Sequence, residues 1–218
     1  MNDNRKLTTT ETMFYFIFSI ILNSFANALT ISTNLGSALW TASAANLSKL
    51  TGIDLGTVLF FYGILVVIFN AILLGRLEWP RMVGNLIFIT PFSYLVQVIT
   101  QWLSSLHIIE MPIIIRLILD LVAILLIAIA VSIYQRVNLV LHPNDDLAYI
   151  LRFKYLHGDP SKAQIASFIP PLIILIISGI IMKNLVAVNI GTVIALFFQG
   201  SLIGWADRYI FTNLKHNI

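Results

Sequence analysis

Residues 34–40, Asn34-Leu35-Gly36-Ser37-Ala38-Leu39-Trp40, have a counterpart 104 positions later in Asn138-Leu139-Val140-Leu141-His142-Pro143-Asn144. Two further matches continue at nearly the same spacing: Gly52 with Gly158, and Val83-Gly84-Asn85-Leu86-Ile87 with Ile190-Gly191-Thr192-Val193-Ile194. We interpret these matches as an internal duplication. Repeat 1 then covers residues 12–104 and repeat 2 covers residues 112–210.

The composition predicts an integral membrane protein. Hydrophobic residues make up 58% of the chain and charged residues 11%, whereas average soluble proteins carry roughly 25% charged residues. A membrane-spanning helix needs about 20 apolar residues. Six stretches reach or approach this length: Met13–Ile31, Leu55–Leu74, Met82–Leu103, Ile113–Tyr134, Ile165–Met182 and Leu185–Trp205. We expect one all-α membrane domain over residues 1–218, a bundle of six transmembrane helices.

A duplication with three spans in each half forces the halves to face opposite ways across the bilayer. Three crossings carry the chain to the opposite surface, so the second half starts where the first half ends. Inverted repeats around a site near the middle of the membrane are a common architecture of small-molecule transporters. The predicted fold is therefore two inverted three-helix repeats.

The distribution of positive charge predicts the orientation. Lys and Arg are enriched in cytoplasmic loops. With the N-terminus inside, all of the 13 Lys and Arg residues except Lys49, Arg116 and Lys183 lie on the cytoplasmic side. Both termini are then cytoplasmic. The pI near 9.3 follows from this asymmetry and indicates anchoring to anionic lipids of the bilayer. It does not indicate nucleic-acid binding, since no basic patch is interleaved with aromatic residues.

The start of the chain also resembles a secretory signal. Arg5 and Lys6 precede an apolar run that reaches Ala26-Asn27-Ala28, a spacing similar to that of a cleavage site. Cleavage there would remove the first span of repeat 1 and leave five spans. The duplication and the charge distribution favour a retained first span.

No residue pattern indicates an enzyme, a metal or a cofactor. The chain has no cysteine, which excludes disulfides and thiolate metal ligands. The histidines are scattered through loops and the tail without metal-ligand spacing; they are His107, His142, His157 and His216. A phosphate-binding glycine loop, a nucleophile elbow and an HExxH motif are all missing.

The polar residues of the first span share one helix face. Asn23, Asn27, Thr30 and Asn34 follow one another at intervals of four, three and four residues. Polar side chains are unfavourable in lipid, so this face should look into the bundle. It either makes hydrogen bonds between helices or lines a solute site. Residues 8–10, all threonine, predict a cap before this helix.

Two polar stretches separate spans at equivalent places in the halves. Residues 36–51 and 142–162 either dip into the membrane as broken helices, where transporters bind ligands, or lie along the lipid head groups. In the fifth span, Pro170-Pro171 predict a bend or a break. Gly84 and Gly191 predict close approach of helices.

Asp120 is the one carboxylate well inside an apolar segment, and such a residue is a functional candidate by default. Arg116 lies four residues earlier on the same helix face. Asp120 therefore either pairs with Arg116 or couples transport to a proton or solute. Asp145 and Asp146 precede an apolar run, where an aspartate is often a helix cap.

Three motifs resemble those of a bacterial family. Leu35-Gly36-Ser37-Ala38-Leu39-Trp40-Thr41 is similar to Leu-Gly-x-x-Pro-Trp-Asp-x-Leu, and His142-Pro143-Asn144-Asp145-Asp146-Leu147 is similar to Gly-Pro-x-Asp-Gly-Leu. Asn189-Ile190-Gly191-Thr192 with Gln199-Gly200 resembles Gly-x-Gly-Thr followed by Gly-Pro. These are motifs of the YczE/YyaS-like membrane proteins, grouped with the YitT type. The resemblance implies a suspected permease of the bacterial cytoplasmic membrane, without a defined substrate.

The chain departs from the family pattern in two places. Leu39 and Thr41 replace the proline and the aspartate of the first motif, and the charged pair usual early in the fifth span is missing between Gln164 and Pro171. Of the acidic residues in these family motifs, only the one at Asp145 is present in this chain. The resemblance therefore implies no ion-coupling role for the replaced positions.

We expect a small-molecule permease with a solute site between the two halves. The candidate solute-binding residues are Asn23, Asn27, Trp40, Asn85, Asp145, Thr192 and Gln199. Their amides and hydroxyls suit a neutral or zwitterionic solute. One alternative is the substrate-binding subunit of an energy-coupling-factor vitamin importer, which would associate with ATPase and transmembrane subunits. The other is a non-transporting accessory membrane protein.

Overall fold

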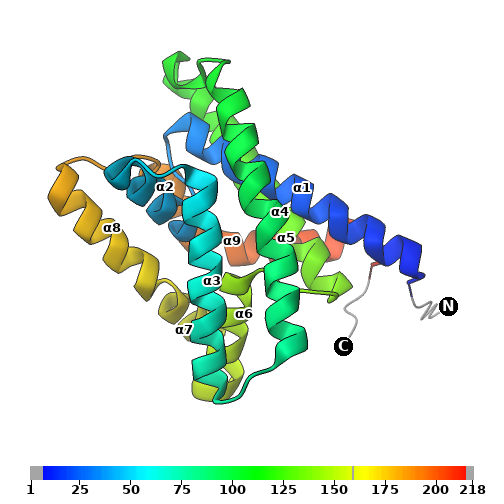
Figure 1. Cartoon of the computed structure of the whole chain (residues 1–218). Coiled ribbons are helices and arrows are strands. Elements are labelled where there is room, and N and C mark those ends of the chain that lie inside the picture. Colours follow the sequence, from blue (N-terminus) through cyan, green and yellow to red (C-terminus); the bar gives the residue numbers. More distant parts are fainter. Residues whose placement is uncertain (1–6, 159, 215–218) are drawn as a thin grey trace.

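The computed structural model describes residues 7–158 and 160–214, which form helices and no strands (Figure 1). The long helices are α1 (Thr9–Thr33), α3 (Leu55–Leu74), α4 (Trp79–Ser104), α5 (Ile113–Val137) and α9 (Ile190–Tyr209). The shorter helices are α2 (Leu39–Thr51), α6 (Pro143–Ile150), α7 (Pro160–Ser167) and α8 (Ile169–Met182), with a 3-10 turn at Ile108–Glu110 and a π-helical turn at Leu151–Tyr155.

All five long helices are long and apolar enough to cross a membrane. This finding indicates a multi-pass membrane protein and confirms the predicted all-α bundle. The predicted fifth span, Ile165–Met182, is divided into α7 and α8. α8 has 14 residues, about 21 Å at 1.5 Å per residue, which is short of a hydrocarbon core of roughly 30 Å. The predicted sixth span starts at Ile190 and not at Leu185.

The division between α7 and α8 lies beside the two adjacent prolines. Pro170 and Pro171 occupy the first turn of α8, where proline is tolerated because the N–H groups of that turn have no partner in the helix. The Ser167 hydroxyl donates to the Gln164 carbonyl at 2.8 Å and so satisfies a carbonyl at the end of α7. The predicted break is confirmed.

α1 begins and points inward as the sequence predicts. Thr8 caps it: the Thr8 hydroxyl accepts from Glu11 N at 3.2 Å, and the Glu11 carboxylate accepts from Thr8 N at 2.8 Å. On the polar face, Asn23 and Asn27 are 4% exposed and Thr30 is fully buried. The prediction that this face looks into the protein is confirmed.

The short helices α2 and α6 each pack on a helix from the other half of the chain. α1 lies along α4 and α5, and α5 also packs on α9. α2 packs on α8, whereas α6 packs on α3, as Figure 1 shows. α2 and α6 thus each contact a helix that is far from them in the sequence.

α1 and α5 end in the same way. Each has 25 residues and stops at an asparagine in the left-handed conformation, Asn34 (φ 51°) and Asn138 (φ 49°). Such left-handed ends are common where helices terminate, and asparagine adopts this conformation more readily than most residues. An extended segment follows each asparagine and leads into α2 or α6.

The first of these segments crosses the start of α9, and we name this contact the first crossing (residues 34–37 against residues 187–192). Ser37 N donates to Ala187 O at 3.1 Å, and Ala187 N donates to Asn34 Oδ1 at 2.8 Å. Hydrogen bonds therefore run in both directions between the two segments.

The centre of the first crossing is a contact between two glycines. Gly191 N donates to Leu35 O at 2.9 Å. A Cβ on Gly191 would lie 3.2 Å from Gly36 Cα, and a Cβ on Gly36 would lie 2.1 Å from Thr192 N. The close packing predicted for Gly191 is confirmed, and Gly36 shares it.

The second segment meets α4, and we name this contact the second crossing (residues 138–141 against Gly84 and Asn85). Asn85 Nδ2 donates to Leu141 O at 2.9 Å. A Cβ on Gly84 would lie 2.7 Å from Val140 Cγ1. At the second crossing the backbone of Gly84 therefore faces the side chain of Val140, whereas at the first crossing two backbones meet.

The segment after α9 lies beside the start of α1. The rings of Tyr15 and Phe18 contact the ring of Phe211, with centroids 5.3 and 6.3 Å apart. Arg136, 1% exposed at the end of α5, donates to three carbonyls that follow α9, those of Ile210, Phe211 and Leu214. The start of α1 and the end of α9 are therefore on the same side of the bundle.

Candidate functional site

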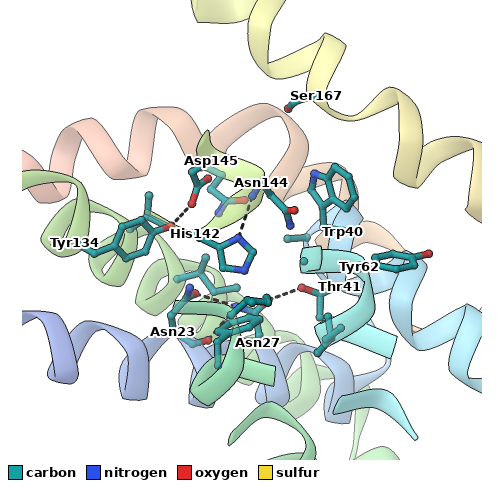
Figure 2. A pocket seen from close by; sticks show the side chains of 18 of the residues that line it. Asn23, Asn27, Trp40, Thr41, Tyr62, Tyr134, His142, Asn144, Asp145 and Ser167 are labelled. Atoms are coloured by element: carbon teal, nitrogen blue, oxygen red, sulfur yellow. Dashed lines mark hydrogen bonds between the residues drawn. The ribbon is translucent and has the colours of Figure 1, made fainter. Parts of the chain in front are cut away.

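The first turns of α2 and α6 line one cavity, which has a volume of about 90 Å³ (Figure 2). Trp40 and Thr41 come from α2, whereas Asn144 and Asp145 come from α6. Helices α1, α3, α4, α5, α7 and α9 complete the wall. We name this space the central cavity.

Most of the predicted solute-binding residues meet at the central cavity. Its lining includes Asn23, Asn27, Trp40, Asp145 and Gln199. Asn85 lines a neighbouring cavity and not this one. Thr192 lies in the first crossing, where its hydroxyl accepts from Ser37 N at 3.2 Å.

An amide network joins α1 to α2 at this cavity. Asn27 Nδ2 donates to Asn23 Oδ1 at 2.9 Å, and the Thr41 hydroxyl donates to Asn27 Oδ1 at 2.7 Å. Figure 2 shows both bonds beneath the His142 ring. Polar groups of α1 thus make an interhelical hydrogen bond and also face the cavity.

The opposite wall is held by Tyr134 of α5. Its ring is 1% exposed, and its hydroxyl donates to Asp145 Oδ2 in a short hydrogen bond. The bond fixes the Asp145 carboxyl at the cavity (Figure 2). Thr41 of α2, which the predicted duplication aligns with Asp145, is likewise bonded to a long helix.

His142 forms part of the cavity wall although the sequence suggested a scattered loop histidine. It is 8% exposed and packs edge-on against the rings of Phe88 and Phe92. Its Nδ1 lies 3.2 Å from Asn144 N and accepts that N–H. The neutral ring then carries its proton on Nε2. In the sequence, the indication of this role was the position of His142 in a stretch predicted to be repeated, directly before Pro143.

Two polar atoms of the lining have no hydrogen-bond partner. They are the Tyr62 hydroxyl and Asn144 Oδ1, both buried. Buried polar groups in proteins are nearly always paired. Asn144 belongs to one of the quoted motifs, but Tyr62 did not stand out in the sequence, because a tyrosine within an apolar span is unremarkable without knowledge of its neighbours.

A larger cavity of about 830 Å³ lies next to the central one and shares Asp145 and Gln164 with it. We name it the side cavity. It lies beside the second crossing, among the start of α4, the end of α5 and α6. Its volume is within the range of roughly 300–1,000 Å³ that small-molecule sites occupy. The central cavity, at about 90 Å³, lies below this range, so any solute larger than a few waters of about 30 Å³ each would have to widen it.

An ion pair lies in the wall of the side cavity. Arg81 Nε is 2.9 Å from both carboxylate oxygens of Asp146, which is 1% exposed. The Arg81 guanidinium also lies over the Tyr149 ring, 5.7 Å from its centroid. His142 and not Asp146 is the cap of α6, and Asp146 therefore joins α6 to α4.

Asp120 and Arg116 do not pair, although the sequence allowed it. Arg116 Nε and Nη2 donate to the carbonyl of Thr33 at 2.8 and 2.7 Å. The Thr33 hydroxyl lies 2.8 Å from Asp120 Oδ1. Thr33, at the end of α1, therefore contacts both residues, Arg116 through its carbonyl and Asp120 through its hydroxyl.

The remaining histidines do not reach the site. His107 and His157 are exposed in turns, and His216 lies outside the described residues. Over residues 7–158 and 160–214 no group of three or more His, Asp or Glu side chains could hold a metal ion.

The central cavity offers amides, an imidazole, hydroxyls and one carboxyl. The first turns of two helices face it, and helix N-termini carry partial positive charge and free N–H groups. The site can therefore hydrogen-bond a polar solute that carries both a negative and a positive or donor group.

Comparison with known proteins gives a family and no function. No curated protein and no solved structure matches the chain. Residues 10–208 match a family of unknown function, DUF6198. The match covers nearly the whole chain, so this protein belongs to the DUF6198 family.

Proposed function

We propose that this protein is a small-molecule permease of the bacterial cytoplasmic membrane, with its solute site at the central cavity between two inverted halves. The observation that carries the proposal is the meeting of α2 and α6 at one cavity. These helices occupy equivalent places in the two repeats. Binding sites between inverted repeats, at the ends of interrupted helices, are typical of transporters.

The pattern of helix contacts supports the two-fold relation. If α1 to α4 correspond in order to α5, α6, α7–α8 and α9, exchange of the halves turns several of the contacts into one another, although the extensive contact of α3 with α4 has no counterpart of similar extent between α7–α8 and α9. The contact of α1 with α4 becomes that of α5 with α9, and α2 on α8 becomes α6 on α3. The left-handed asparagines at the ends of α1 and α5 fit the same exchange.

The two crossings extend this relation to single residues. In the proposed alignment, residues 34–37 correspond to residues 138–141, and Gly191 corresponds to Gly84. Each segment crosses the helix of the other half at that glycine. Segments that match in sequence thus make equivalent contacts.

The orientation follows from charge and from the position of the chain ends. α7 and α8 together would form one bent crossing and give six. The start of α1 lies beside Phe211, which follows α9, as an even number of crossings requires. The positive-inside rule then places both ends in the cytoplasm.

The difference between the crossings supports a conformation that is open to the cytoplasm. The first crossing is closed by glycine on glycine, whereas the second has the side cavity of about 830 Å³ beside it. In the proposed orientation the side cavity is cytoplasmic. A solute would enter through it and reach the central cavity past Asp145 and Gln164, which border both spaces.

The proposed solute is small, polar and neutral or zwitterionic. A zwitterion would place its negative group at the first turns of α2 and α6 and its positive group at Asp145. The unpartnered atoms on Tyr62 and Asn144 would bond the solute or its waters.

A screen by thermal unfolding tests this function. Purified protein is heated with amino acids, vitamins or sugars, and a true ligand at about 100 times its Kd should add roughly 2.7 kcal/mol to the free energy of unfolding. Trp40→Ala should lose the response, because Trp40 lines the central cavity. Trp102→Ala, with a ring 58% exposed on α4, should keep it.

Uptake of the stabilising solute into liposomes that contain only this protein completes the test. The proposal is contradicted if the solute stabilises Trp40→Ala as much as the parent, or if it binds without uptake. Binding without uptake, together with copurifying ATPase subunits, would instead indicate an importer subunit.

A further inference from the structure

Asp120 is a buried carboxyl group without an ionic partner. It is 0% exposed, and no Lys or Arg in the described part of the chain forms an ion pair with it. Oδ1 contacts the Thr33 hydroxyl, and Oδ2 has no hydrogen-bond partner. Burying an unpaired charge is very costly, and such a group normally neutralises instead.

The hydrogen bonds around Thr33 indicate where the protons lie. Asn34 N donates to Ile31 O at 3.1 Å, so Thr30 O has lost its usual helical donor. The Thr33 hydroxyl replaces that donor, with Oγ1 2.8 Å from Thr30 O. A hydroxyl has one proton, so Thr33 can donate to the Thr30 carbonyl or to Asp120 Oδ1, which lies 2.8 Å from Thr33 Oγ1, but not to both at once. When the carbonyl takes the proton, the contact with Asp120 is a hydrogen bond only if Asp120 is protonated and donates.

The Asp120 carboxyl group lies directly behind the first crossing. A Cβ on Gly191 would lie 1.9 Å from Asp120 Oδ2, so the carboxyl touches the backbone of α9 where α9 meets Gly36. The elements packed here against α5 are α1 and α9, which present Thr33 and Gly191 to the carboxyl. On α5 itself, the Arg116 charge is turned to the Thr33 carbonyl. A negative charge on Asp120 would have no compensation in the closed crossing.

We propose that Asp120 is a proton-binding site that controls the first crossing. With the proton bound, Asp120 donates to Thr33 and the crossing is closed. When the proton leaves, the charge must be hydrated, which requires α9 to separate from the segment at Gly36. If the chain is the permease proposed above, the proton is its coupling ion and opens or closes the outer side.

Cysteine labelling tests this site without knowledge of the solute. The chain has no cysteine, so Ser37→Cys, fully buried in the first crossing, is a reporter without background. The labelling rate by a water-soluble maleimide is measured on purified protein in detergent over a series of pH values. If opening of the first crossing is linked to the loss of one proton, the labelling rate should rise with pH by up to about tenfold per pH unit. This increase adds to the one that ionisation of the thiol itself produces.

Two controls separate gating from thiol chemistry. Asp120→Asn mimics the neutral acid, so Ser37→Cys in that background should stay protected at every pH. Thr51→Cys, exposed at the end of α2, reports the pH dependence of an accessible thiol with Asp120 intact. This second control keeps the test valid should Asp120→Asn not fold.

The proposal is overturned if the labelling rate of Ser37→Cys rises with pH no more steeply than that of Thr51→Cys. It is also overturned if the labelling rate of Ser37→Cys has the same pH dependence in the Asp120→Asn background as in the parent. Failure of the permease proposal is a different result. In that case no solute stabilises or crosses, while the excess pH dependence of Ser37→Cys persists.

Discussion

Gly36→Ala should lower the free energy of unfolding by several kcal/mol. The added Cβ would lie 2.1 Å from Thr192 N and 2.5 Å from the Gly191 carbonyl carbon. These are backbone atoms, which cannot turn aside as the end of a side chain can. Overpacking costs about 1–3 kcal/mol, and a side chain at φ 152° costs about 1–3 kcal/mol more. Thermal unfolding in detergent measures the loss.

Gly200→Ala is the matched control for this change. An added Cβ there has nothing within 4 Å, and the residue is exposed in α9. Alanine is favoured over glycine within a helix by about 1 kcal/mol, so this variant should be as stable as the parent or more stable. Equal stability of the two variants would contradict the glycine contact at the first crossing.

Arg81→Ala should destabilise the protein, though by less than the roughly 3–5 kcal/mol typical of a fully buried ion pair, because the Arg81 side chain is 28% exposed. The change leaves the Asp146 carboxylate, 1% exposed, without its cation. Arg76→Ala is the control, since the Arg76 side chain is 72% exposed in its pair with Glu78 and exposed pairs contribute at most about 1 kcal/mol. Thermal unfolding of both variants gives the comparison.

A double variant shows whether the loss arises from the stranded charge. Arg81→Met with Asp146→Leu removes both charges and keeps apolar volume, which is often neutral or stabilising in buried pairs. We expect this variant to be more stable than Arg81→Ala. If the double variant is the less stable of the two, the effect comes from packing around Arg81 and not from the unpaired carboxylate.

Local patterns in the sequence were sufficient to predict most of the long helices. The bounds predicted for the second span agree with α3, and the threonine cap, the polar face of α1 and the break near Pro170 are also present. Each of these features depends on residues within a few turns of one another. Composition and periodicity report such relations well.

The contacts between distant segments could not be predicted. Asp120 and Arg116 have the spacing of a helical ion pair, but a free carbonyl at the end of α1 takes the guanidinium. Tyr134 and Asp145 meet only because α6 folds back beside α5. The packing of α2 on α8 and of α6 on α3 likewise depends on the whole fold. The first turns of α2 and α6 were therefore visible as polar stretches, while their shared cavity was not.

The proposed two-fold relation between the halves is tested most directly by the sides of the membrane on which residues aligned by the duplication lie. Thr51 and His157 are exposed at equivalent places, just before Gly52 and Gly158. In intact cells, a membrane-impermeant maleimide should label Thr51→Cys, and it should label His157→Cys only after the membrane is opened. Labelling of both cysteines from the same side would contradict the inverted arrangement and the solute site that depends on it.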